Sequence, residues 1–383
     1  MKTLLVGLFA SFVFFELVLR GLSLYSYQIK FYTNNPHQRR FLDDVVDWRG
    51  LAASTLCPMP PGGVLNGFII NSRGNISPEM PYDKQPGTKR LVLVGDSHAV
   101  GAVPYPDHFI RVLERRVNET SEYQLDVINL GLNCIGPLIE EKILALEGAR
   151  YDPDVVVLAF FVGNDFTDDR IYNDKFVKAK KNERHIMPPL FYQSQLLSFF
   201  RNYIVFHMSP HNAPTLQAAS EGKPGTYIGF PGFDAQRPSF SEEEYLGIEQ
   251  ERSQIFFHNS EAYEDVETIQ QNIRSMKSVS ERSNAKFVVL IIPDEMQVNE
   301  SLLQKVASLS GRRITDYNIH YPQQLLTRFL DENAIDYVDL FSFWKDSSKS
   351  AGFYLNQDSH LNVSGNMAVA DILHPRIQLL LDQ

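Results

Sequence analysis

The sequence predicts a doubly wound α/β protein, a three-layer α/β/α sandwich with a central parallel sheet. From residue 90 to the C-terminus, short runs rich in Val, Leu and Ile alternate with longer segments of helical periodicity. The short runs are apolar at successive positions, which is typical of strands buried on both faces of a parallel sheet. Repeated alternation of such strands with helices is the pattern of βαβ units, and it favours a flavodoxin-like arrangement.

Five strands and five covering helices are expected in this region. The strands are predicted at 90–95, 124–131, 154–164, 285–293 and 335–340. The helices are predicted between and after them, at 104–118, 137–149, 261–283, 322–332 and 364–381. The polar and aromatic stretch at about 168–260 breaks the alternation, and we interpret it as a long insertion of the kind that shapes a site at the edge of a sheet.

The rest of the chain divides into an N-terminal apolar segment, residues 1–22, and an irregular arm, residues 23–88, before the α/β domain at 89–383. The apolar run from Thr3 to Leu19 is just long enough to cross a bilayer, although Glu16 interrupts it. It resembles a signal peptide or an uncleaved signal anchor, and we favour the anchor because no small-residue cleavage site follows directly.

The orientation of this segment is less clearly encoded. Lys2 favours a cytoplasmic N-terminus, and the catalytic domain would then be periplasmic or extracellular. Arg20, Lys30, Arg39 and Arg40 follow the segment and favour the opposite orientation. We expect one membrane-anchoring helix and an extracytoplasmic domain.

Composition argues against several other classes of partner. A net charge of -10 and the lack of a basic stripe argue against nucleic-acid binding. The two cysteines, Cys57 and Cys134, lack metal-ligand spacing, although they can pair with each other. His207 and His211 are four residues apart, but Pro210 breaks a helix that would align them, so we expect no metal site and no cofactor.

The first predicted strand ends in Gly95-Asp96-Ser97-His98. A serine at a strand-to-helix turn projects its hydroxyl above the carboxyl edge of the sheet, where a nucleophile is accessible. Ser97 is therefore the candidate nucleophile, although a serine here is also a common helix N-cap.

Three further elements end at the same edge. The second strand is followed by Gly131 and Cys134, the third by Asn164, and a late segment carries Asp358 and His360. If that segment is extended, residues two apart face the same way, so Asp358 can orient the ring of His360.

These blocks resemble the SGNH (GDSL-like) hydrolase superfamily in composition and order, over about residues 71–381. GDS at 95–97 and GND at 163–165 are the matching motifs, and the approach to the first strand is similar to that of bacterial membrane-anchored members. The resemblance implies the SGNH hydrolase fold, with Ser97 as nucleophile, His360 as base and Asp358 orienting it. It also implies an oxyanion hole formed by the backbone of Ser97, the backbone of Cys134 and the Asn164 amide.

Two departures from the family pattern matter. Cys134 stands where the family usually has the oxyanion glycine, and Gly131 lies nearby. Asp358 lies two residues before His360, whereas many members place the aspartate three before, where this chain has Gln357. This D-x-H spacing, like His98 after the nucleophile, resembles SGNH proteins that O-acetylate polysaccharides. We expect Asp96, His98 and Gly131 to border the site without reacting.

The sequence therefore predicts a serine esterase that acts on acyl or acetyl esters of carbohydrate or lipid through an acyl-Ser97 intermediate. One alternative is an O-acyltransferase that acetylates an envelope or exported polysaccharide. The other is an inactive binding module on the same fold, which is disfavoured because every reacting residue type is present.

Overall fold

The computed structural model describes residues 2–33, 59, 62–172, 194–208, 222–347 and 349–383. The chain forms two compact units. The N-terminal unit comprises Met1–Glu79 and Ile171–Ile228, and the sheet unit comprises Met80–Arg170 and Gly229–Gln383.

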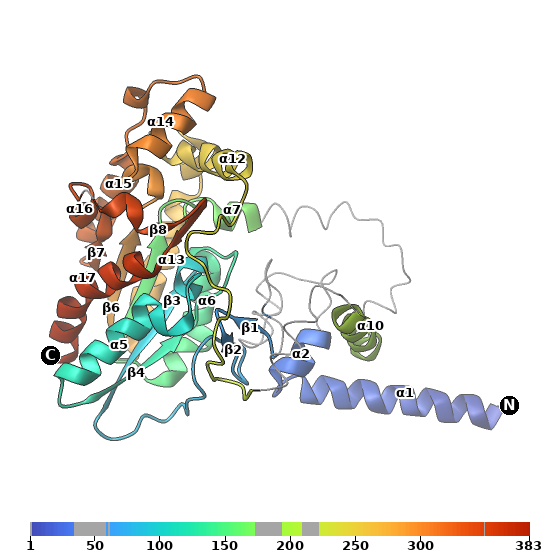
Figure 1. The fold of residues 1–383 in the computed structure, drawn as a ribbon. Helices are drawn as coiled ribbons and strands as arrows, with labels where there is room; N and C mark the ends of the chain where they lie inside the picture. Colours follow the sequence, from blue (N-terminus) through green and yellow to red (C-terminus); the bar gives the residue numbers. More distant parts are fainter. Residues whose placement is uncertain (1, 34–58, 60–61, 173–193, 209–221, 348) are drawn as a thin grey trace. The chain divides into compact units, whose positions relative to one another are not determined.

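The sheet unit is built on five parallel strands. In chain order they are β3 (Thr88–Gly95), β4 (Gln124–Asn129), β5 (Val155–Phe161), β6 (Lys286–Ile292) and β7 (Asp336–Asp339). Their spatial order is β4-β3-β5-β6-β7, so the first strand lies between the second and the third (Figure 1). This is the flavodoxin-like order, and it confirms the predicted fold class.

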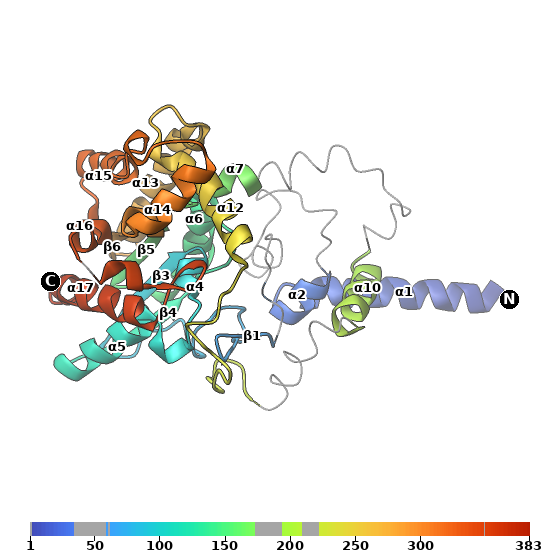
Figure 2. The same cartoon turned by 45° about the horizontal axis from the view of Figure 1, so that its top comes forward.

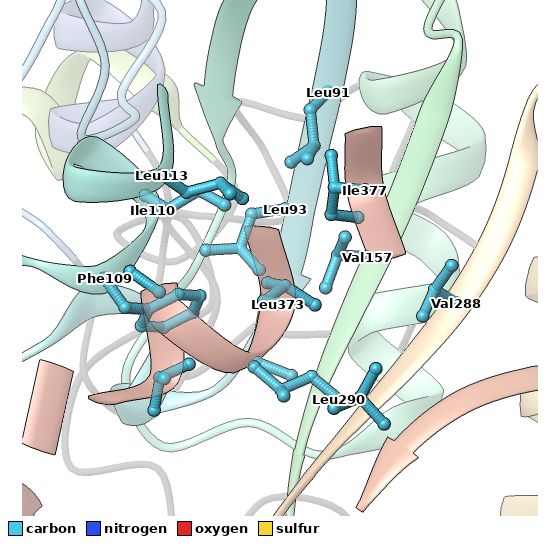
Figure 3. Close-up of a cluster of buried hydrophobic side chains, with 14 of the residues drawn as sticks. Leu91, Leu93, Phe109, Ile110, Leu113, Val157, Val288, Leu290, Leu373 and Ile377 are labelled. Atoms are coloured by element: carbon cyan, nitrogen blue, oxygen red, sulfur yellow. The ribbon is translucent and has the colours of Figure 1, made fainter. Parts of the chain in front are cut away.

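One face of the sheet is covered by α5 (Phe109–Thr120) and α17 (Val363–Leu381), which pack on each other. Alternate residues of the strands face them. In Figure 3, Leu91 and Leu93 of β3 and Val157 of β5 lie against side chains of these helices, including Leu113, Leu373 and Ile377. The intervening residues of β3 and β5 are equally buried on the other side. Burial on both faces explains the unbroken apolar runs in the sequence.

The helices α6 (Pro137–Leu146) and α13 (Val266–Arg282) also pack on each other and complete the sandwich. Two predicted helices begin later than expected. Tyr105–Asp107 and Glu261–Tyr263 are 3₁₀ turns that precede α5 and α13, and the predictions had joined them to those helices.

Several short elements of the sheet unit were not predicted. The helices α12 (Glu242–Arg252) and α14 (Glu300–Leu309) pack on each other (Figure 2). The antiparallel hairpin of β8 (Tyr354–Leu355) and β9 (Asp358–Leu361) is too short to give a periodic signal. The helices α4 (Ser97–Val100), α7 (Asp168–Tyr172) and α16 (Leu340–Trp344) were not among the predicted ranges either. The helix α15 (Tyr321–Glu332), by contrast, is the one predicted at 322–332.

The described part of the N-terminal unit contains α1 (Lys2–Leu22), α2 (Tyr27–Thr33), α10 (Gln195–Met208) and a small ribbon of β1 (Val64–Leu65) and β2 (Phe68–Ile69). The helix α1 is long and apolar enough to cross a membrane, a property that signal sequences share, and none of its residues is buried in the structure.

Candidate active site

Ser97 is the first residue of α4, directly beyond the carboxyl end of β3. The turn is tight because Gly95 lies against the neighbouring strand: a Cβ on Gly95 would come within 2.8 Å of the Ala159 carbonyl oxygen. Asp96 caps α4, since its Oδ1 accepts a 2.8 Å hydrogen bond from the His98 backbone N–H. The glycine and the cap together fix where the Ser97 hydroxyl projects.

The structure brings the three predicted catalytic side chains together. Ser97 Oγ lies 2.8 Å from His360 Nε2, and His360 Nδ1 lies 2.6 Å from Asp358 Oδ1. Asp96 Oδ2 is 3.4 Å from the same hydroxyl, so the hydroxyl donates to the shorter contact, the imidazole. The three side chains have the hydrogen-bonded arrangement that nucleophile, base and orienting carboxylate have in serine hydrolases.

The hairpin β8–β9 holds Asp358 and His360. Both lie on the short strand β9 and face the same way, as the two-residue spacing predicts, and the backbone N–H of His360 also donates to Asp358 Oδ1 at 3.0 Å. Gln357 makes the turn with φ 49°, a left-handed conformation. Asn366 of α17 supports the strand from behind by donating to the Leu361 carbonyl at 3.0 Å.

Asp358 is charged in this setting. Burial raises the pKa of its carboxyl, but hydrogen bonds from His360 and Ser239 and the charge of His360 outweigh this and lower the pKa below its usual value. A carboxylate next to Nδ1 keeps the proton on that nitrogen and leaves Nε2 free to accept the proton of Ser97. The charge state and the geometry therefore support the same tautomer.

The donors predicted for an oxyanion hole differ in their availability. The Ser97 N–H lies in the first turn of α4, where a backbone donor has no acceptor within the helix. The Asn164 amide instead donates to Asp96 Oδ2 at 3.0 Å and to Asp168 Oδ2 at 2.9 Å. Both amide hydrogens are thus directed at carboxylates, and Asn164 would have to share one of them with an oxyanion.

Gly131 and Cys134 have separate roles in the loop after β4. The N–H of Gly131 donates to Asn129 Oδ1 at 2.8 Å, and a Cβ at Gly131 would come within 2.7 Å of Ala99. Gly131 therefore permits close packing against α4. Cys134 has φ 60°, a left-handed conformation that glycine adopts readily and other residues rarely do. It is disulfide-bonded, and Cys57, the other cysteine of the chain, lies outside the described residues.

His98 is buried beside the base. Its ring stacks on that of His360 with centroids 5.0 Å apart and on that of Phe161 at 3.9 Å. Burial and then the charges of His360 and Arg252 lower the pKa of His98 well below its usual value. The uncharged His98 ring can therefore serve as a packing surface for the imidazole of His360.

Three carboxyl groups, of which those of Asp96 and Asp165 are buried, gather next to Ser97. Asp96, Asp165 and Asp168 each place an oxygen within 4.8 Å of the other two, a grouping able to hold a metal ion. Burial raises the pKa of Asp96, and that of Asp165 still further with help from neighbouring carboxylates, so protons compete with any cation. Amide donors already bind these carboxyl groups: the Phe161 backbone N–H donates to Asp165. The Asn164 side-chain amide donates to Asp96 and Asp168. We derive no step through a metal.

Two ionisable residues near the site, Arg252 and Glu140, were not predicted from the sequence. The Arg252 guanidinium lies 5.4 Å from the Phe161 ring centroid, and its charge acts on both Asp96 and His98. The helix that carries it was recognisable, because Ser241 and Glu244 form a capping box. Glu140 is fully buried, and neither carboxyl oxygen has a hydrogen-bond partner among the described residues. Its sequence neighbours gave no sign of that burial.

The histidine pair considered as a metal site gives no further information, since His211 and the side chain of His207 lie outside the described residues.

Comparisons with known proteins gave structural matches only. No protein-family model matches the chain, and no curated protein matches its sequence. Among solved structures, the chain is similar to a lipase/acylhydrolase from Enterococcus faecalis, with 14% identity over 76% of this chain and 95% of that one, at a TM-score of 0.39. It is also similar to the acetyl xylan esterase AlAXEase, with 15% identity over 75% and 99% of the two chains, at a TM-score of 0.38. A third is TesA, with 13% identity over 76% and 99%, at a TM-score of 0.39.

Asp169 should make folding stability fall as the pH rises. Burial raises the pKa of its carboxyl to about 7, against roughly 3.9 in an unfolded chain. Between these values the unfolded state loses its proton first, so the free energy of unfolding decreases from about pH 4 to about pH 7 and then levels off. In Asp169→Asn, which keeps an acceptor for the Leu138 N–H, this contribution should vanish. Urea denaturation of both proteins in mild detergent at several pH values measures it.

Asp316→Asn is the control of opposite sign. Hydrogen bonds from Arg313 lower the pKa of the exposed Asp316 carboxyl, so its contribution to stability is present above the unfolded pKa and is lost as the pH falls. If both substitutions change the pH dependence of the free energy of unfolding in the same direction, the raised pKa of Asp169 is contradicted.

Proposed function

We propose that this protein is a serine esterase of the SGNH hydrolase type, acting on acyl or acetyl esters of carbohydrate or lipid. The observation that carries the proposal is the continuous hydrogen-bonded chain from Ser97 Oγ through His360 to Asp358, with distances of 2.8 and 2.6 Å. An inactive binding module would have no use for an imidazole hydrogen-bonded to a serine hydroxyl.

In the acylation step, Ser97 Oγ attacks the ester carbonyl carbon and His360 Nε2 takes the hydroxyl proton. The negative charge that develops on the carbonyl oxygen is stabilised by the Ser97 N–H, the Cys134 N–H and, where it is shared, the Asn164 amide. Removing one such donor typically costs ~3 to 4 kcal/mol of transition-state stabilisation. The protonated His360 then gives its proton to the leaving alcohol oxygen as the C–O bond breaks.

The acyl group now resides on Ser97. Water loses a proton to His360 as it attacks the acyl carbon, and the returning proton restores the Ser97 hydroxyl as the acid is released. Asp358 remains charged throughout and stabilises the imidazolium that forms twice per cycle.

We further propose that α1 is an uncleaved anchor and that the catalytic domain lies outside the cytoplasm. The length and apolar character of α1 support a membrane span. An anchored esterase of this kind acts on esters of the envelope or of exported glycans.

A second candidate is transfer of the acyl group to a sugar hydroxyl in place of water. Two sequence features favour it, the D-x-H spacing of Asp358 and His360 and the GDSHA string at 95–99. Both reactions use the same acyl-Ser97 intermediate and differ only in the acceptor.

Ser97→Ala should abolish turnover of 4-nitrophenyl acetate, because His360 would then have no nucleophile to activate. The partly buried Ser97 side chain fills no core position, so thermal unfolding should match that of the parent protein. Retention of more than a few per cent of the parent rate would remove Ser97 from the mechanism.

His360→Ala should cost more activity than Asp358→Asn. His360 carries the proton, a contribution of ~10²- to 10⁴-fold. Asp358 binds the Nδ1 side of the ring and the His360 backbone N–H and does not contact Ser97. The values of kcat/KM for an aryl acetate rank the two variants, and equal or reversed losses would contradict these roles.

If the protein is an acyltransferase, acyl-Ser97 should react faster with a bound oligosaccharide hydroxyl than with water. A bound and oriented acceptor has a large effective molarity. The protein is incubated with an activated acetyl donor and a panel of glycan oligomers, and acetylated sugar and free acetate are measured by mass spectrometry. Free acetate alone with every acceptor would leave hydrolysis as the reaction.

A further inference from the structure

The helix α10 carries an exposed apolar stripe. Phe200, Ile204 and Met208 follow one another at four-residue intervals and are 55%, 50% and 76% exposed. Residues four apart lie on one face of a helix, so these three side chains form a continuous surface. An apolar stripe of this kind in contact with water is unfavourable, and it indicates a partner surface.

The opposite face of α10 is already occupied. Ser198 is buried, the Phe199 ring lies 5.7 Å from the ring of Tyr32, and Asn202 donates to the Tyr32 carbonyl oxygen at 2.8 Å. Tyr32 belongs to α2, which directly follows α1. These contacts fix the rotation of α10 about its axis and leave the stripe facing outward.

Glu16 of α1 binds the start of α10. Its carboxylate accepts hydrogen bonds from the Ser194 hydroxyl at 2.8 Å and from the backbone N–H groups of Gln195 and Leu196, both at 2.9 Å. A carboxylate at a helix N-terminus satisfies donors that have no partner within the helix and complements the helix dipole. Arg20 pairs with the same carboxylate at 2.8 Å.

This arrangement explains how an acidic residue is tolerated in the apolar segment. Its carboxylate accepts from the Ser194 hydroxyl and from two backbone donors of α10 and pairs with one cation, so these groups take the place of water around it. If the end of α1 lies at the bilayer surface, the Glu16 contact also sets how deep the start of α10 lies in the bilayer. Glu16 precedes Leu22, the end of α1, by about 9 Å along the helix, which matches the roughly 5 to 10 Å to which interfacial helices enter a bilayer.

We propose that α1 and α10 form one membrane-contacting unit, in which α10 lies along the bilayer surface with Phe200, Ile204 and Met208 in the lipid. The Glu16 contact holds α10 against α1, an apolar helix none of whose residues is buried, so the lipid that would surround α1 is the partner nearest to the stripe. Tyr25, 80% exposed, and Tyr203, 41% exposed, supply the aromatic side chains that favour the headgroup region. The inference rests on the retention of α1 proposed above.

Brominated lipid tests the contact directly. The full chain carrying Phe200→Trp is reconstituted into phosphatidylcholine vesicles with bromines on the acyl chains, and its fluorescence is compared with that of the parent protein. We expect the added emission to be blue-shifted and strongly quenched. Phe343→Trp is the matched control, because Phe343 is 58% exposed and lies in the sheet unit. Equal quenching of the two added tryptophans, or none in either, would overturn the proposal.

The role of Glu16 has its own test. In Glu16→Ala the amides of Gln195 and Leu196 lose their acceptor, so hydrogen exchange at the start of α10 should accelerate at least several-fold. Arg20→Ala is the control, since it removes the cation and keeps the acceptor. Unchanged exchange in Glu16→Ala would contradict the cap.

Intact-mass measurement of the purified protein separates the possible failures. A mature chain that begins after α1 would refute the anchor and this inference together. It would leave the esterase proposal intact, because that proposal depends on Ser97 turnover alone.

Discussion

Parallel pairing of β3 with β4 on one side and β5 on the other places three strand ends side by side at one edge of the sheet. Parallel strands all end at the same edge, so Ser97 after β3, the loop of Gly131 and Cys134 after β4, and Asn164 after β5 become neighbours. The topology of the sheet alone is enough to bring these residues, which are far apart in the chain, to one place. The β8–β9 hairpin lies at the same edge, where His360 contacts Ser97 and Asp358.

Beneath that edge the protein keeps its charge low. Burial raises the pKa of Asp96, raises those of Asp165 and Glu140 well above their usual values and lowers that of His98, so burial opposes the charged form of each of these groups. Asp358 is the exception, since its hydrogen bonds hold it ionised. Asp358 also makes the shortest of these contacts with His360, at 2.6 Å, and an interaction between groups this close is stronger in a partly buried site than in water.

The sequence allowed the fold to be predicted, and the pairing of Asp358 with His360, for the same reason: both follow local rules. Continuous apolar runs identify the strands, and the two-residue period predicts that Asp358 faces the same way as His360. Contacts between distant segments have no such rule. Nothing near Asn164 indicates that its amide is directed at Asp96 and Asp168, and nothing near Glu16 points to a helix that begins almost 180 residues later. Glu16, which interrupts the apolar run in the sequence, caps α10 in the structure.

The segment before α12 contacts the hairpin that carries Asp358 and His360. Ser239 hydrogen-bonds the Asp358 carboxylate, and its N–H donates to the Asn356 carbonyl oxygen at 3.2 Å. Asn356 in turn donates to the Gln236 carbonyl oxygen at 2.8 Å, so the loop before α12 is bound to the turn of the β8–β9 hairpin at several points. The same stretch of chain leads into Arg252, the cation beside Phe161. A change in this segment would therefore also move the Asp358 carboxylate that is hydrogen-bonded to His360, so under the proposed mechanism a substitution there would affect the alignment of the imidazole.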